Sequence, residues 1–151
     1  MISATHLHAI VIHFPIALLV IGFISEIASF FYKKDFLKNV AFYLLLIGAI
    51  GAITAYISGS YAGKGIEEGP LKIPMKLHEN AALITLILAI ITALLKVSLF
   101  YFKYHNIWTK RLYILLFTAL TVAVLYTGYL GGQLVYSHGA GVELALPDFN
   151  N

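Results

Sequence analysis

The sequence predicts an all-α integral membrane protein, an antiparallel up-and-down four-helix bundle with its N and C termini both outside. Of the 151 residues, 60% are hydrophobic and 11% are charged, whereas soluble domains carry about 25% charged residues. Four apolar segments are each long enough to cross a bilayer, and most of the cations lie beside the same two connections between them. We therefore expect residues 1–151 to form a single transmembrane domain.

The four predicted helices follow from segment length, because about 20 predominantly apolar residues cross the hydrocarbon core of a bilayer. The first runs from about 8 to 32 and is interrupted only by Glu26, and the second runs from about 39 to 63 without any charge. The third and fourth run from about 78 to 102 and from about 108 to 136. The first segment has no basic region before it and exceeds the length of a signal-peptide core, so we expect it to be retained as a helix.

The cations predict the orientation, because Lys and Arg near helix ends stay on the cytoplasmic side. Seven of the ten lie in or beside the connections between helices one and two and between helices three and four: Lys33, Lys34, Lys38, Lys96, Lys103, Lys110 and Arg111. This side is predicted to be cytoplasmic. The expected location is a bacterial inner membrane, which the chain crosses several times.

The chain contains no cysteine. Disulfides, iron–sulfur clusters, thiolate metal sites and covalently attached haem are thereby excluded. Any metal chemistry has to use histidine, carboxylate or methionine side chains.

Histidines are the strongest chemical signal in the sequence. The predicted topology places every histidine except His105 at or near the outer face, and three different helices deliver them. Neutral imidazole is the commonest metal ligand, and ionisable groups inside a membrane usually mark function. The predicted cofactor-binding residues are His13, His78, His138 and His8, and the predicted metal ligands are His13, His78 and His138. For His6 and His105 we expect a structural role.

Two carboxylates and one proline have simple structural interpretations. Glu26 lies in the cytoplasmic half of the first helix, where an unpaired charge is costly, so we expect an ion pair with a cation such as Lys96. Glu79 is interpreted as a capping carboxylate at the start of the third helix, or else as a group that orients the ligand His78. Pro15 is expected at a first turn or a kink.

Three motifs resemble a known family. They are His8-Ala-Ile-Val-Ile-His13-Phe-Pro-Ile-Ala-Leu, the histidine His78 that opens the third helix, and Gly131-Gly132-Gln-Leu-Val-Tyr-Ser-His138-Gly-Ala-Gly-Val142. Over nearly the whole chain they resemble the bacterial four-helix membrane family catalogued as domain of unknown function 2231. Some relatives are fused to redox domains, and the arrangement is similar to small di-haem cytochrome b proteins, so the resemblance implies electron transfer. Ala9 departs from the family, where proline often follows the first histidine, and so does Gln133.

The first functional hypothesis is a b-type haem protein that passes electrons between quinol and an external redox protein at the outer face. Propionate recognition is its weak point, because the only arginine, Arg111, is on the opposite side and Lys64, Lys72, Lys76 or backbone N–H groups have to replace it.

Two alternatives stay open: a bare Cu, Fe or Zn ion held by histidines, and a non-catalytic scaffold subunit that packs through small residues. A homo-oligomer stays open as well. No catalytic residues are indicated, and we expect no nucleic-acid partner.

Overall fold

Four long helices make up almost all of the residues that the structure describes. The structure is a computed structural model that describes residues 3–64, 69–103 and 106–142. Within these ranges the helices are α1 (Ala4–Tyr32), α2 (Asp35–Ala62), α3 (Lys72–Tyr101) and α4 (Ile107–Tyr136). Each is about 42 to 45 Å long at 1.5 Å per residue, and all four are long and apolar enough to cross a membrane. The predicted all-α, membrane-spanning fold class is confirmed.

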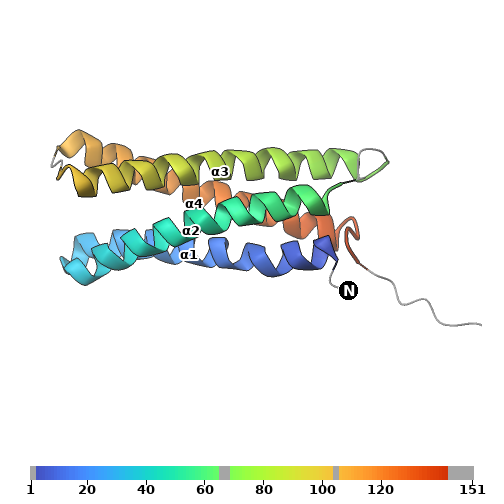
Figure 1. The fold of residues 1–151 in the computed structure, drawn as a ribbon, viewed down its shortest axis with the longest axis horizontal. Helices are drawn as coiled ribbons and strands as arrows, with labels where there is room; N and C mark the ends of the chain where they lie inside the picture. The colour runs from blue at the N-terminus through green and yellow to red at the C-terminus, as the bar shows by residue number, and fades with distance from the viewer. Residues whose placement is uncertain (1–2, 65–68, 104–105, 143–151) are drawn as a thin grey trace, which may run out of the picture.

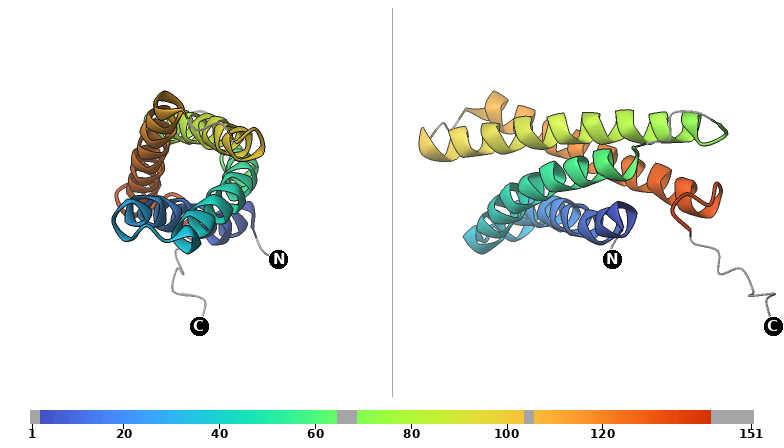
Figure 2. Two further views of the ribbon diagram at one scale, coloured as in Figure 1. Left: turned by 90° about the vertical axis from the view of Figure 1, so that its left-hand side faces the viewer. Right: turned by 45° about the vertical axis from the view of Figure 1, so that its right-hand side comes forward.

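The helices run up and down around a four-sided bundle (Figure 1). Each packs on the helices before and after it in the order α1, α2, α3, α4, and α4 returns to α1. Seen from the end, the four helices form the corners of a square (Figure 2). The contacts are most extensive within the pairs α1–α2 and α3–α4, so the bundle consists of two helical hairpins placed face to face.

The two ends of the bundle differ in chemistry. The α1–α2 and α3–α4 connections lie at one end, which carries the seven cations identified in the sequence and is called the basic end. The other end holds the start of α1, the α2–α3 connection and the end of α4 (Figure 1). A cavity of about 1100 Å³ opens there, and this end is called the cavity end.

The protein interior is small and the outer surface is apolar. The core is built around fully buried side chains of all four helices, namely Leu19, Leu45, Ala89, Phe117 and Leu120. Large apolar residues such as Phe14, Ile24 and Leu115 are exposed on the outside. A contiguous apolar exterior of this kind is stable in lipid and not in water.

Glycines of α2 bring α1 and α2 close together. A Cβ atom at Gly48 would lie 2.8 Å from Leu19 Cδ2, and one at Gly51 would lie 3.2 Å from Pro15 Cβ. Pro15 is buried inside α1 rather than in its first turn, and its ring packs on this glycine. Because these glycines have no side chains, α1 and α2 can approach each other closely.

The helices begin earlier than the hydropathy pattern indicated. Ser3 caps α1, because its hydroxyl oxygen accepts a hydrogen bond from the backbone N–H of His6, so α1 starts before His8. α3 begins at Lys72 rather than at His78, with Pro74 in its first turn, where the missing N–H is tolerated. The interpretation of Glu79 as a helix cap was wrong, since this residue lies two turns inside α3 and forms an ion pair with Lys76 at 3.6 Å.

A buried ion pair joins the two hairpins near the basic end. Lys96 Nζ of α3 lies 3.1 Å from a carboxylate oxygen of Glu26 in α1. The Tyr113 hydroxyl of α4 donates to the same oxygen at 3.3 Å, and its ring lies 4.1 Å from the ammonium nitrogen. The predicted pairing of Glu26 with Lys96 is confirmed.

Candidate functional site

The cavity at the cavity end lies between the two hairpins. All four helices line it, and on α3 its lining extends from Lys72 to Leu86, which is about 21 Å along a helix axis. Small-molecule sites usually enclose about 300 to 1,000 Å³, so this volume suits a large organic ligand. Most of the wall is apolar.

His8 enters the cavity from α1. Its Nδ1 lies 3.0 Å from the hydroxyl oxygen of Ser58 on α2, and that hydroxyl donates its own hydrogen to the Ala55 carbonyl. Nδ1–H of the imidazole is therefore the donor, and Nε2 of the neutral ring keeps its lone pair. The ring lies against α2 at Gly59, where a Cβ atom would be 2.9 Å from His8 Cε1.

His78 enters from α3 in the same way. Its Nδ1 lies 3.2 Å from the backbone carbonyl oxygen of Thr127 on α4. A carbonyl only accepts, so Nδ1–H is again the donor and Nε2 is free. The ring lies against Gly131, where a Cβ atom would be 3.2 Å from His78 Cε1.

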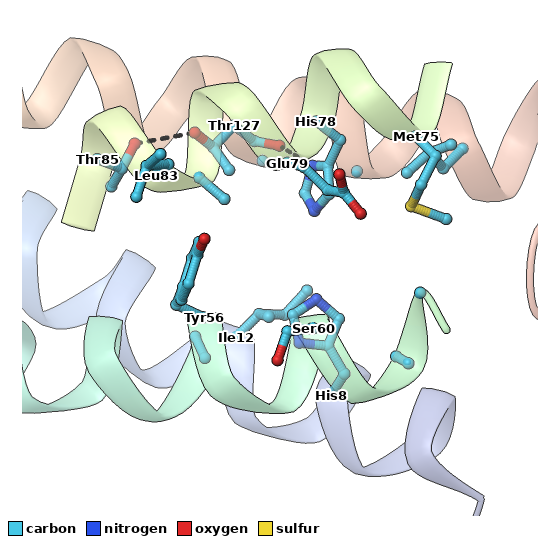
Figure 3. A pocket seen from close by; sticks show the side chains of 18 of the residues that line it. His8, Ile12, Tyr56, Ser60, Met75, His78, Glu79, Leu83, Thr85 and Thr127 are labelled. Carbon is cyan, nitrogen blue, oxygen red and sulfur yellow. Dashed lines mark hydrogen bonds between the residues drawn. The ribbon is translucent and has the colours of Figure 1, made fainter. Parts of the chain in front are cut away.

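The two imidazoles face each other across the cavity. Their ring centroids are 6.4 Å apart and their planes are inclined by 73°. Figure 3 shows the two rings pointing toward each other from opposite walls. Metal-binding histidines typically donate one ring N–H to a protein acceptor and offer the other nitrogen to the metal, which is the state of both rings here.

A common spacing relates the histidine pair to the ion pair. Glu26 follows His8 by eighteen residues, and Lys96 follows His78 by eighteen residues. Eighteen residues are five helical turns, so each histidine and the charge on its helix share one face and lie about 27 Å apart. This repeated spacing on α1 and α3 is the sequence signal that would have paired His8 with His78.

The other histidines lie elsewhere. His13 is exposed on α1, with its Nδ1 2.6 Å from the Ala9 carbonyl oxygen, and it does not line the cavity. His138 is exposed in the turn after α4. His6 contacts the hydroxyl of Ser3, and His105 lies outside the described residues. The structure therefore brings together only His8 and His78 of the four predicted cofactor-binding residues, and the described residues contain no group of three or more His, Asp or Glu side chains arranged for a metal ion.

Two further side chains with possible metal-ligand atoms border the cavity near His78. The Glu79 carboxylate and the Met75 thioether both project into it (Figure 3). Deeper in the cavity, the hydroxyls of Thr85 and Thr127 are 2.9 Å apart and bond to each other. Sequence reasoning had not singled out Ser58 or Thr127, which fix the two imidazole rings.

The fold and the cavity define a class, a multi-pass membrane protein of two helical hairpins with one inward-facing histidine from each. The family model described as "Predicted membrane protein (DUF2231)" matches residues 4–144, and the chain belongs to this family. The resemblance found in the sequence is thereby confirmed. No curated protein and no solved structure matches the chain.

Proposed function

We propose that this protein binds a non-covalent b-type haem between His8 and His78 and transfers electrons at the cavity end. The observation that carries the proposal is the pair of facing imidazoles, whose Nδ1–H groups are both engaged and whose Nε2 atoms are both free. Two histidines on opposite faces of the iron are a usual ligation for a haem held between helices.

The separation of the rings supports one metal ion between them. A metal bonds an imidazole nitrogen at about 2.0 to 2.1 Å, so two imidazoles on opposite sides of one ion have centroids about 6 Å apart. The observed separation is 6.4 Å. The separation of the two ring centroids therefore matches the spacing that such an ion requires.

The form of the cavity supports a flat ligand. The gap lies between two hairpins that have fewer contacts with each other than within themselves, and the histidines enter it from opposite walls (Figure 3). Gly59 and Gly131 let each ring lie back against its neighbouring helix, which leaves the space between the rings open. Along α3 the lining extends about 9 Å from His78 toward Lys72 and about 12 Å toward Leu86, so a macrocycle has room on both sides of the histidines.

A bare metal ion is the second candidate, favoured by one observation. Glu79 and Met75 border the cavity beside His78 (Figure 3), and imidazole with thioether ligands suits copper. It is second because only two imidazoles of the described residues converge, whereas a bound ion commonly takes three or four protein ligands.

The cations favour an outward-facing site. The basic end is cytoplasmic by the distribution of Lys and Arg, so the cavity end faces the outside of a bacterial inner membrane. Membrane quinol as donor and an external redox protein as acceptor fit a haem in this position.

Optical spectra of detergent-purified protein test the proposal. After haem-supplemented expression, the oxidised and dithionite-reduced spectra should show a Soret band with sharp reduced α and β bands. His8→Ala and His78→Ala should each lose this six-coordinate spectrum, whereas the matched controls His13→Ala and His138→Ala should keep it. A featureless visible spectrum with bound copper, iron or zinc by elemental analysis would overturn the haem proposal in favour of the bare ion.

A further inference from the structure

The cavity is polarised along its length. Three lysines line its mouth, Lys64 after the end of α2 and Lys72 and Lys76 at the start of α3. The deep part is lined by apolar side chains such as Ile12, Ile16 and Leu86. Such a cavity fits an amphipathic ligand with an anionic edge at the mouth and an apolar body inside.

The lysines are available to a ligand. Lys72 has no ion-pair partner within the described parts of the chain. Lys76 is 70% exposed and 3.6 Å from Glu79, a distance beyond a good hydrogen bond. Lys64 Nζ lies 4.3 Å from the centroid of the Tyr61 ring, and Lys64 forms no ion pair with any residue that the structure describes. Exposed pairs of this kind contribute little and are readily exchanged.

The start of α3 adds to the positive potential at the mouth. Its N-cap residue, Leu71, has no side-chain acceptor for the first backbone N–H groups. An uncapped helix N-terminus favours anions through these groups and the helix dipole. Lys72 and Lys76 project from the first two turns of α3. The backbone N–H groups and the lysine ammonium groups therefore both contribute hydrogen-bond donors at the mouth.

We propose that the mouth is an anion-binding subsite that fixes the orientation of the ligand, with Lys64, Lys72 and Lys76 holding its carboxylates. The inference rests on the proposed function, for which these carboxylates are the two haem propionates. Lys72 lies about 9 Å and Lys76 about 3 Å along α3 from His78, and both lysines line the cavity that the two histidines enter. The propionate edge then faces the outer solution, where an external redox protein meets it.

Titrations with haemin and haemin dimethyl ester test this subsite, because the ester has the same macrocycle without the anionic charges. The full-length apoprotein in detergent is compared with the triple variant Lys64→Gln, Lys72→Gln, Lys76→Gln. The matched control is Lys33→Gln, Lys34→Gln, Lys38→Gln at the basic end. Binding is followed by the Soret shift.

The mouth variant should bind haemin at least about tenfold more weakly, since several charge-assisted contacts are lost. Its affinity for the ester should be unchanged, and the basic-end control should bind both ligands normally. Equal affinities for haemin in all three proteins would overturn the anion subsite while leaving the haem proposal intact. The absence of any Soret shift in the unsubstituted protein would refute the haem proposal itself, and the subsite for propionates with it.

Discussion

Replacing Lys96 by methionine removes one partner of the buried ion pair and should strongly destabilise the bundle. The side chains of Lys96 and Glu26 are only 18% and 8% exposed, and their charged atoms are 3.1 Å apart. At an effective dielectric constant of 20 this separation corresponds to an attraction of about 5 kcal/mol. Breaking a buried pair from one side costs about 3 to 5 kcal/mol, because the remaining charge stays buried without its partner.

The free energy of unfolding in detergent measures this effect. Unfolding by SDS, followed by circular dichroism, should place Lys96→Met about 3 kcal/mol or more below the unsubstituted protein. The control Lys38→Met removes an exposed ion pair with Asp35 at the same end and should change stability by less than about 1 kcal/mol. The double variant Glu26→Gln, Lys96→Met should recover much of the loss, because no charge is then left unpaired.

Two results would refute this reasoning. Equal stabilities of Lys96→Met and Lys38→Met would mean that the pair is solvated rather than buried. A double variant that is as unstable as the sum of its single variants would show that Glu26 and Lys96 act independently. Tyr113→Phe is a smaller perturbation and should cost about 1 kcal/mol, because it removes one hydrogen bond to the carboxylate.

Three further predictions concern glycines and topology. Gly59→Ala should reduce the amount of bound cofactor, because its Cβ atom would lie 2.9 Å from Cε1 of the His8 ring. The control Gly132→Ala should not, because no atom lies within 4 Å of its Cβ position. Equal cofactor content in the two variants would contradict the position of the His8 ring. Gly48→Ala should destabilise the α1–α2 packing by about 1 to 3 kcal/mol in SDS unfolding, because it overpacks Leu19. A reporter fused to either terminus should read as external, and a cytoplasmic signal from both would reverse the orientation.

The fold class was predicted correctly because a bilayer allows few types of structure to cross it. The number of spans follows from the length of apolar segments, and the pairing of Glu26 with Lys96 follows from the cost of an isolated charge in a membrane. The helix starts were misplaced because Ile73, Pro74 and Met75 extend α3 beyond its most apolar part. Hydropathy alone does not detect such an extension, since backbone hydrogen bonds and a tolerated first-turn proline decide it.

The sequence by itself determined the membrane class, the four spans, the basic end and the gathering of histidines toward the opposite end. Only the tertiary structure decided which histidines share a cavity, because neighbours on one helix face in different directions. His8 and His13 are five residues apart, so their directions differ by about 140° around α1, and of the two only His8 lines the cavity. The packing of α3 on α4 makes His78 the partner of His8. The contacts of the His78 ring with Thr127 and Gly131 on α4 direct this ring into the same cavity.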